Sequence, residues 1–407
     1  MNTSLCKAFS KDDTLTIPEF PTLSISFYRT IDEMYSTWDA TQPGFFMSER
    51  FLGVVETVPP EGMTFLYSLV REDGRVKAII PAQIMLYEAD KSLSNPLQEE
   101  TGDWRVKLKQ NIKQRLAGWI KLKTMVVGNL LLTGEHAVHG VPSTEHEQLL
   151  TWAIPRMLQH LKKQGQKISL IFVKDFFDQP GVAPMSPCCY FRFKAHPNMI
   201  MDLPDRWQSL DDYLQALSSK YRIRANRALK KAASLQCRTL SPEEVDNYKY
   251  HMYALYEQVV KNADFNLFHL HPDYFSTMYK NFSGQFFMHG FFIHNELVGF
   301  CSYFIHDNIL EAHFLGYDHR LNNSIQLYLN MLLKLIDFAI HHRVKRIIMG
   351  RTAMEIKSSV GAIGYDMHCY LRHTNPFINA LLPRIYRTLE TDFSWVPRSP
   401  FKGEEML

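Results

Sequence analysis

Three side chains of one predicted strand are candidates for acid–base chemistry. The segment Ile309–Tyr317 has the composition of a β-strand, and successive side chains of a strand point to opposite faces. We therefore expect Glu311, His313 and Tyr317 on one face. Glu311 or His313 would accept the proton of an attacking amine while the other orients it, and Tyr317 would act as general acid for a leaving thiolate. An edge strand with a solvated face, or a satisfied buried histidine, would give the same pattern.

Four cations are candidates for binding the phosphate groups of a donor: Arg222, Arg224, Arg351 and Lys357. Arg351 and Lys357 lie in the segment 350–359, in which Thr352 and Glu355 have the spacing of a capping box and predict a helix start. A helix N-terminus favours anions, and two cations beside it suit a phosphate or a carboxylate. The capping box alone accounts for Thr352 and Glu355, but it does not account for the two cations.

The other two cations belong to a basic segment, Lys220–Lys231, that contains no acidic residue. If this segment is helical, a stripe of cations follows one side at the spacing of successive turns. The stripe consists of Lys220, Arg224, Arg227 and Lys231, and the alanines of the segment gather on the opposite side. Such a stripe favours a phosphate-rich partner, namely a nucleotide cofactor, tRNA or lipid head groups. A solvated helix face is the alternative.

A polar and basic insertion, residues 90–124, contains a second basic segment. Between Trp104 and Lys123 there are seven Lys or Arg residues and no acidic residue. On a helical wheel the apolar residues, which include two tryptophans, occupy one broad side, although three of the cations fall within it. A basic amphipathic helix of this kind suits the surface of an anionic membrane. Packing on the protein's own core and a protein or RNA partner are the alternatives.

The elements that would position these residues occur twice along the chain. In each half the hydrophobic patterns predict a hairpin, a strand, a helix and a second strand, in that order. The first copy spans 64–87, 125–133, 145–164 and 167–174, and the second copy spans 286–305, 309–317, 324–342 and 345–349. Asp73 and Gly74 mark the first hairpin turn, because this pair tolerates positive φ. The region between the copies, 207–283, is expected to be mainly helical.

This duplication predicts an α/β (α+β) fold of two tandem modules, each with a mixed central sheet flanked by helices. We expect a leader at 1–24 and a first module at 25–205 that carries the insertion 90–124. A second module at 206–407 would begin with the helical segment 207–283. The length of 407 residues suits two domains of ordinary size.

The cysteine pattern and the missing motifs argue against several other classes of protein. The six cysteines form no Cys-x-x-Cys pair and the 17 histidines have no ligand spacing, so we expect neither a disulfide framework nor a metal site. No apolar run of about 18 residues occurs, and the first residues lack the apolar core of a signal peptide. There is no Gly-x-Ser-x-Gly, Walker or Rossmann motif. A cytoplasmic protein is the simplest interpretation.

Three segments carry a resemblance to a known family. They are Ser219–Arg224, Leu315–Asp318 and Gly350–Ala362. Together with the order of the elements, they resemble the GNAT acyltransferases, and in particular the tandem-GNAT group of FemAB-like proteins and acyl-CoA N-acyltransferases. The resemblance covers residues 25–375. It implies two GNAT-like modules and the transfer of an acyl group to an amine.

One loop departs from the pattern of that family. In ordinary GNAT enzymes the loop after the central strand reads Arg/Gln-x-x-Gly-x-Gly/Ala, and its backbone amides hold the pyrophosphate of coenzyme A. Here the loop is Asp318–Ser324 and contains no glycine. The donor would then be held in another way, or would be carried on a protein or a tRNA. The segment 207–283 also lacks the long helical hairpin that Fem-type enzymes use for tRNA.

The expected function is therefore that of an N-acyltransferase, with acyl-CoA or acyl carrier protein as donor substrate and no tightly bound cofactor. The basic insertion favours an amine acceptor in a membrane, such as an aminolipid or a sphingoid base, and hence a role in lipid metabolism. The alternatives are an aminoacyl-tRNA-dependent transferase for a peptidoglycan precursor, with tRNA the less favoured partner, and a non-catalytic module of the same fold. We expect a cytoplasmic protein in peripheral contact with the inner face of the cytoplasmic membrane through Trp104–Lys123.

Overall fold

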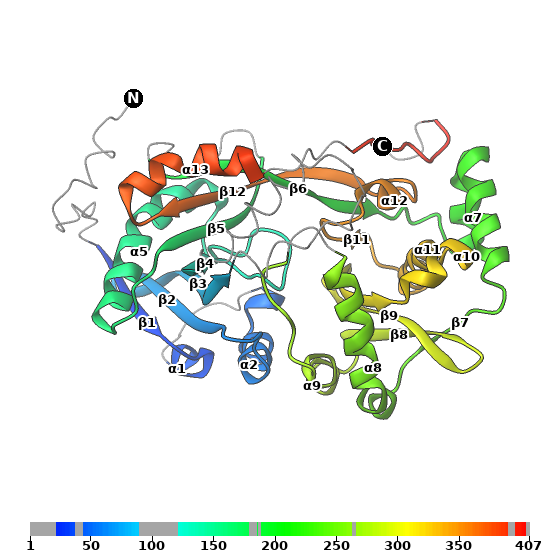
Figure 1. Ribbon diagram of the computed structural model, residues 1–407, viewed down its shortest axis with the longest axis horizontal. Helices are drawn as coiled ribbons and strands as arrows, with labels where there is room; N and C mark the ends of the chain where they lie inside the picture. Colours follow the sequence, from blue (N-terminus) through cyan, green and yellow to red (C-terminus); the bar gives the residue numbers. More distant parts are fainter. Residues whose placement is uncertain are drawn as a thin grey trace, which may run out of the picture. The chain divides into compact units, whose positions relative to one another are not determined.

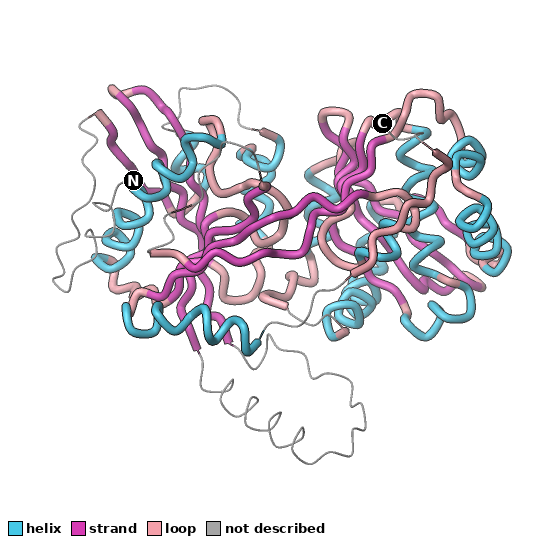
Figure 2. The backbone as a smooth tube through the Cα atoms, turned by 90° about the horizontal axis from the view of Figure 1, so that it is seen from above, coloured by secondary structure: helices cyan, strands magenta, loops and turns pink. Residues whose placement is uncertain are grey.

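A computed structural model describes residues 22–36, 44–88, 121–178, 185, 189–262, 266–389 and 395–403 of the chain. These residues form two compact units (Figure 1). Unit 1 contains the described residues up to Ala195, Leu267–His269 and the described part of Asp366–Asp392, and unit 2 contains the remainder. In each unit the strands form a central layer and helices lie on its faces (Figure 2). The expected α/β fold with mixed sheets flanked by helices is confirmed.

The described strands of unit 1 follow the order β1-β2-β3-β4-β5-β12. Their bounds are β1 Leu23–Tyr28, β2 Thr64–Glu72, β3 Arg75–Glu88, β4 Lys121–Val127, β5 Leu170–Phe177 and β12 Ile363–His373. Neighbouring strands pair antiparallel, except that β4 and β5 are parallel. The helices are α1 Ile31–Tyr35, the 3-10 helix η2 Phe45–Met47, α2 Glu49–Thr57, α5 Ser143–Lys163 and α13 Pro376–Leu389.

The described strands of unit 2 follow the order β6-β11-β10-β9-β8-β7. Their bounds are β6 Phe191–Asp202, β7 Gln236–Thr239, β8 Phe286–Ile293, β9 Glu296–His306, β10 Ile309–Tyr317 and β11 Arg346–Ile348. Here β10 and β11 form the parallel pair. The helices are α6 Leu210–Ala216, α7 Ser219–Lys231, α8 Pro242–Lys261, α9 Tyr274–Asn281, the 3-10 helix η3 His319–Leu321, α10 Asn322–Ile325, α11 Leu327–His341 and α12 Met354–Ser358.

The two units repeat one pairing scheme, but their sixth strands are exchanged. Strand β6 follows β5 along the chain, yet its residues Ile200–Asp202 pair with β11. Strand β12 follows β11, yet its residues Met367–His373 pair with β5. The predicted modules, 25–205 and 206–407, are contiguous, whereas the compact units are not, because β12 and α13 return to unit 1. Hydrophobic patterns indicate the order of strands, but they do not indicate which strands pair.

Local sequence signals set several of the element ends. Helix α8 begins with a capping box, in which the Ser241 hydroxyl accepts a hydrogen bond from the Glu244 N–H (3.3 Å) and the Glu244 carboxylate accepts one from the Ser241 N–H (2.9 Å). Helix α5 ends before Gly165, which has a φ of 74°. The β2–β3 turn places Asp73 and Gly74 at positive φ, as predicted.

Each unit has its own hydrophobic core. In unit 1, α5 packs Trp152 and Met157 against buried residues of β2–β5. In unit 2, α11 packs Leu333 and Ile336 against α6, α7 and β11. Burying a large apolar side chain stabilises a fold by about 1.5–3 kcal/mol. These contacts hold the central strands, and thereby the residues at the strand ends, in place.

Two predicted segments lie partly outside the described residues. Of the leader 1–24, residues 1–21 are not described, whereas Leu23 and Ser24 belong to β1 and pair with β2. The predicted leader is therefore too long, because this apolar–polar alternation joins the sheet.

Of the predicted basic helix Trp104–Lys123, residues 104–120 lie outside the described residues. Its last part is wrong, because Lys121–Lys123 begin strand β4 and pair with β3. The Lys121 ammonium also lies 2.6 Å from the carboxylate of Glu88. The alternating Lys-Leu-Lys sequence thus follows the period of a strand.

Two kinds of feature are absent from the described residues. No helix in this part of the chain is long and apolar enough to cross a bilayer. No group of three or more His, Cys, Asp or Glu side chains in the same residues is placed to hold a metal ion.

Candidate functional site

Strand β10 has the predicted bounds, but it does not alternate throughout its length. Its pairing with β9 shifts by one residue in the middle of the strand, which is a β-bulge. Before the bulge Glu311 pairs with Phe304, and after it Tyr317 pairs with Gly299. Since these partners are five residues apart on β9, they lie on opposite faces. The prediction that Glu311 and Tyr317 share a face is therefore wrong, because the bulge reverses the alternation.

Glu311 is a buried carboxylate near the start of β10. Its residue is 6% exposed, and its Oε2 lies 3.7 Å from Nε2 of His306. On the other side of that ring, Nδ1 lies 3.2 Å from Oδ2 of Asp307. Burial raises the pKa of Glu311, whereas the pKa of His306, which burial lowers, is raised overall by its two carboxylate neighbours. A carboxyl group with a raised pKa suits proton transfer near neutral pH.

His313 lies in the bulge and packs among aromatic rings. Its Nε2 is 2.6 Å from the hydroxyl of Tyr274 on α9. Centroid distances of 4.4 to 6.3 Å separate its ring from those of Phe286, Phe304 and Phe314. Burial lowers the pKa of His313 to about 3, so that the imidazole is neutral at physiological pH. These contacts fit a hydrogen-bonded core histidine, and a catalytic role of His313 stays a prediction.

Tyr317 lies at the other end of β10. Its ring stacks on Tyr328 of α11 at 5.7 Å and lies 4.3 Å from the ring of His319. Burial raises the pKa of Tyr317. Six residues of a strand span roughly 20 Å, so Tyr317 and Glu311 do not act on one atom.

Strands β10 and β11 pair over a short stretch only. Their parallel register ends at Glu311 and Ile348, and beyond this point the edge of β10 has no pairing partner in β11. Backbone N–H and C=O groups at such an edge can bind a carbonyl or an amide of a ligand. We refer to residues 312–317, with Met349 and Gly350 at the end of β11, as the β10 opening.

Lys357 lies at the β11 side of this opening. Its helix, α12, has five residues and begins after Ala353, which has a φ of 53°. The Lys357 side chain is buried, and its Nζ donates a hydrogen bond to the carbonyl oxygen of Met349 (2.6 Å). Burial lowers the pKa of Lys357 to about 7. The amine is therefore directed at the protein backbone.

The predicted capping box of Thr352 and Glu355 is wrong. The N-cap of α12 is Ala353, and no side chain caps this helix. The Glu355 carboxylate instead binds the guanidinium of Arg398 (3.0 Å) and accepts a hydrogen bond from the N–H of Val396 (3.3 Å). Arg398 also holds the pKa of Glu355 below its usual value. A segment about 40 residues farther along the chain thus replaces the local cap.

The basic segment 220–231 forms helix α7, and its predicted packing face is confirmed. Ala225 and Ala228 are buried. The stripe of Lys220, Arg224, Arg227 and Lys231 is exposed. None of these four cations forms an ion pair or a side-chain hydrogen bond with a residue that the structure describes. The stripe therefore presents uncompensated positive charge to solvent.

The four cations predicted to hold donor phosphates do not form one cluster. Residues two apart on a helix are separated by about 200°, so Arg222 and Arg224 point to different sides of α7. Arg222 is half-buried and Arg224 is exposed. Arg351 is half-buried as well, and Lys357 is buried. Phosphate binding by these side chains stays a prediction.

Helix α7 lies beside the glycine-free loop that follows β10. It packs against α10, within that loop, and against α11. The Asn330 amide donates hydrogen bonds to the carbonyls of Ala228 on α7 (3.1 Å) and Gln326 at the end of the loop (3.1 Å). The exposed cations of α7 are thus carried by a helix that is anchored next to this loop.

Unit 1 has a corresponding opening between β4 and β5. Their parallel pairing ends at Val127 and Val173. Gly128, with a φ of 116°, follows β4, and two buried charged residues, Lys174 and Asp175, follow the last paired residue of β5. We refer to this region as the β4 opening.

Lys174 and Asp175 form a buried ion pair. Nζ of Lys174 also donates to the carbonyl of Leu132 (2.7 Å), and the Asp175 carboxylate accepts from the N–H of Gly134 (3.3 Å) and from Sγ of Cys369 (3.5 Å). Asp175 has a φ of 61°, which side chains other than glycine rarely adopt. Strained backbone and buried charge concentrate at functional sites.

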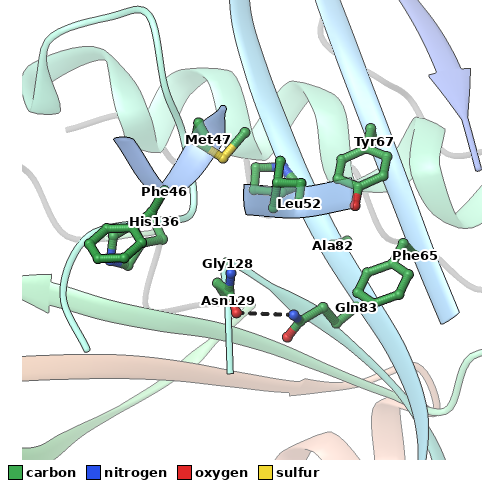
Figure 3. Close-up of a pocket in the computed structure, with 11 residues that line it drawn as sticks. Phe46, Met47, Leu52, Phe65, Tyr67, Ala82, Gln83, Gly128, Asn129 and His136 are labelled. Carbon is green, nitrogen blue, oxygen red and sulfur yellow. Dashed lines mark hydrogen bonds between the residues drawn. The ribbon is translucent and has the colours of Figure 1, made fainter. Parts of the chain in front are cut away.

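A pocket of unit 1 opens beside Gly128 (Figure 3). It encloses about 290 Å³, part of which is open to solvent. Its lining residues are Phe46, Met47, Leu52, Phe65, Tyr67, Pro81, Ala82, Gln83, Gly128, Asn129 and His136. The lining is thus mainly apolar and aromatic, with a few polar groups, which is typical of small-molecule sites.

The polar groups of the pocket include an amide pair. Nε2 of Gln83 donates to Oδ1 of Asn129 (3.1 Å), as Figure 3 shows. Burial and the carboxylate of Glu56 raise the pKa of the Tyr67 hydroxyl well above its usual value. Burial lowers the pKa of His136 to about 3, so no lining side chain carries a charge at neutral pH. The pocket therefore favours a neutral ligand group.

Sequence reasoning missed His306, the pocket and the buried ion pair. Two signals could have indicated them. Lys174 and Asp175 interrupt the apolar run of β5, and a charged pair within a buried strand is unusual. Asn129 follows Gly128 where an apolar strand ends, which is a common place for ligand-binding groups.

No protein-family model and no curated protein matches the chain. Among solved structures it is similar to a tandem GNAT protein from the clavulanic acid biosynthesis pathway, with 14% identity, 87% of this chain and 99% of that chain covered, and a TM-score of 0.47. It is also similar to FemX, with 9% identity, 90% and 100% covered, and a TM-score of 0.47. For L-PGS from Bacillus licheniformis the values are 12% identity, 84% and 97% covered, and a TM-score of 0.43. At these identities the likeness concerns the fold.

Proposed function

We propose that the chain is an N-acyltransferase that uses the β10 opening of unit 2. The observation that carries this proposal is a buried carboxylate, Glu311, at the last residue where β10 and β11 pair. Directly beyond it lies the strand edge without a partner in β11, which suits an acyl carbonyl. A base next to a bound carbonyl is what the acylation of an amine requires.

In the proposed reaction the amine nitrogen attacks the carbonyl carbon of a thioester and forms the C–N bond. The proton of the amine passes to Glu311, and the bond from carbon to sulfur breaks with its electron pair on sulfur. The raised pKa of Glu311 makes it a stronger base, and Nε2 of His306 lies 3.7 Å from its carboxylate. His313 has no role in the proposed step, because its Nε2 is hydrogen-bonded to Tyr274. Tyr317 has none either, because it lies at the other end of β10 and stacks on Tyr328.

For the donor we propose acyl-CoA or acyl carrier protein, held through its phosphate groups by the exposed stripe of α7. The stripe is free of ion pairs with the described residues, and its helix is anchored beside the loop after β10. Side-chain cations would thereby replace the backbone amides of a glycine-rich loop. Arg224 and Arg227 are the central members of the stripe.

For the acceptor we retain the proposal of a membrane amine, either an aminolipid or a sphingoid base. It comes from the basic segment Trp104–Lys123, most of which lies outside the described residues.

The test is thiol release from acyl-CoA in the presence of an amine. Purified protein is incubated with octanoyl-CoA and either sphinganine or no amine, and free coenzyme A and the amide product are measured by mass spectrometry. We expect thiol release that depends on the amine and equals the amide formed. Thiol release without amide, or no release with any of a panel of acyl-CoA and acyl carrier protein thioesters, would contradict the proposal.

A second candidate is an aminoacyl-tRNA-dependent transferase, because the uncompensated stripe of α7 also suits the phosphates of RNA. It predicts that RNA copurifies with the protein and that binding weakens steeply with salt. Replacing Arg224 and Arg227 with alanine would then reduce the salt dependence. A protein that binds thioesters but transfers nothing would instead be a non-catalytic module.

A further inference from the structure

Helix α13 of unit 1 exposes a row of large apolar side chains. The exposed fractions are 74% for Phe377, 40% for Ile378, 47% for Leu381 and 42% for Ile385. With about 100° of rotation per residue, these positions fall within an arc of about 100° on one side of the helix. Scattered exposed apolar residues are ordinary, but a continuous stripe on one helix face marks a surface that binds something.

The opposite side of α13 is fixed to unit 1. The ring of Tyr386 packs on Phe191 (5.1 Å) and Phe193 (4.8 Å), which belong to the first part of β6, up to Ala195, and thus to unit 1. The Asn379 amide donates to the carbonyl of Cys189 (3.2 Å). The helix start is also fixed, because Oδ1 of Asn375 accepts from the N–H of Phe377 (2.9 Å). The stripe therefore lies on the side of the helix away from these contacts. Figure 1 shows α13 at the periphery of unit 1.

The charges of α13 indicate the kind of surface that it meets. The helix contains Arg384 and Arg387 and no acidic residue. Arg384 lies at the edge of the apolar stripe on a helical wheel, one residue before Ile385. An apolar stripe bordered by arginine is the pattern of a helix that lies in the plane of an anionic lipid surface.

We propose that α13 docks unit 1 on an anionic bilayer, with Phe377, Ile378, Leu381 and Ile385 inserted among the lipid chains. The arginines contact lipid phosphates at the rim. A second copy of the chain is disfavoured as occupant, because two such helices would bring their arginines together without any acid of the helix to compensate them. This surface belongs to an element that the sequence did not predict.

The test is cosedimentation of the full chain with vesicles. Vesicles of phosphatidylcholine alone and of phosphatidylcholine with phosphatidylglycerol are compared for wild type and for the double variant Phe377→Glu and Leu381→Glu. We expect binding to the anionic vesicles only, and a loss of about tenfold or more in the variant, because two apolar side chains no longer enter the lipid.

The matched control is the double variant Tyr250→Glu and Val396→Glu in unit 2, where the two side chains are 70% and 55% exposed outside the stripe. It adds the same two negative charges, and we expect it to bind like wild type. A second readout is Phe377→Trp, whose fluorescence should shift to the blue with anionic vesicles.

Three results would overturn the proposal. The first is equal binding of wild type and the double variant. The second is no binding of wild type to either vesicle. The third is a wild-type dimer that the double variant dissociates, since a second copy would then cover the stripe.

Discussion

A buried lysine donates a hydrogen bond to a backbone carbonyl both at the β4 opening of unit 1 and at the β10 opening of unit 2. The charges around the two lysines differ. In unit 1, Lys174 binds the carbonyl of Leu132 and has the carboxylate of Asp175 beside it. In unit 2, Lys357 binds the carbonyl of Met349, and its pKa falls to about 7 through burial. The same pairing scheme thus places one lysine in an ion pair, whereas burial lowers the pKa of the other.

The two openings also differ in their central strand. The pairing of β4 with β3 is regular, whereas β10 bulges against β9. The bulge is held by Ser302, whose hydroxyl donates to the carbonyl of Phe314 (2.8 Å) and accepts from its N–H (3.1 Å). In unit 1 the buried carboxylate at the end of the parallel pairing, Asp175, lies on β5 and forms an ion pair with Lys174, whereas in unit 2 Glu311 lies on the bulged central strand itself, beside His306. This difference is why we assign the chemistry to unit 2 and a neutral binding pocket to unit 1.

The largest expected effect is on the ion pair of unit 1. Asp175→Asn keeps the left-handed backbone, which asparagine tolerates, but leaves the Lys174 ammonium buried without a counter-charge. We expect the free energy of unfolding to fall by about 3–5 kcal/mol in urea denaturation. The control Asp178→Asn removes an ion pair with Arg192 at a half-exposed site and should cost less than about 1 kcal/mol. Equal losses of unfolding free energy for the two variants would contradict the view that burial makes the Lys174–Asp175 ion pair matter more than an exposed one.

The next effect concerns pH and Lys357. Its pKa is about 7 in the folded chain and 10.5 in the unfolded reference, so between these values the unfolded chain binds more protons. Stability should therefore rise with pH, by roughly 3 kcal/mol over about two pH units above 7. Lys357→Met should remove this rise when the two proteins are compared by urea denaturation at each pH.

Lys402 is the matched control for that experiment. Its Nζ also donates to a backbone carbonyl, that of Gln215 (2.7 Å), but the side chain is exposed. Lys402→Met should leave the pH dependence of wild type intact. If the Lys357→Met protein kept the full rise as well, burial of Lys357 would not be its source.

A smaller loss is expected from the bulge. Ser302→Ala leaves the N–H and the carbonyl of Phe314 without their partner in a buried place. We expect a loss of about 1–3 kcal/mol in unfolding free energy. At a moderate temperature, acyl transfer should fall by more than the loss of folded protein explains, because the edge of β10 moves when the bulge loses this support. Ser324→Ala, whose hydroxyl donates to Leu321 at an exposed site, is the control and should change neither property.

The smallest effect on stability is expected on the surface of α7. Arg224→Ala with Arg227→Ala removes two exposed cations and should change unfolding free energy by less than about 0.5 kcal/mol. The KM for acyl-CoA should rise severalfold with little change in kcat, since the contact is to donor phosphates. Arg75→Ala on β3 of unit 1, also exposed, is the control and should leave KM unchanged. An unchanged KM in the double variant would remove α7 from the donor site.

The sequence predicted much of the fold and less of the site, for physical reasons. The bounds of β10, the helix α7 and the turn at Asp73 and Gly74 follow from local periodicity and local backbone preferences. The bulge depends on Ser302 in another strand, and the partners of Glu355 lie about 40 residues away. Such contacts between distant segments leave no periodic trace. The exchange of β6 and β12 could not be predicted either, because each strand pairs with a segment far away in the sequence.

The pocket of unit 1 shows a second limit of sequence patterns. Its polar groups, Gln83 and Asn129, come from β3 and from the end of β4, and each by itself resembles an ordinary polar residue. Only their 3.1 Å hydrogen bond and the buried Tyr67 hydroxyl beside them indicate a binding site. The charged pair Lys174–Asp175 was the clearer of the two visible signals, because buried strands rarely contain ions.

The central claim is that Glu311 is the base for amine acylation at the β10 opening. It is tested most directly by the single-turnover rate of amide formation from octanoyl-CoA and sphinganine for wild type, Glu311→Gln and the exposed control Glu296→Gln on β9. We predict that Glu311→Gln slows the step by about a hundredfold or more and that Glu296→Gln does not. Wild-type rates in the folded Glu311→Gln protein would contradict the claim.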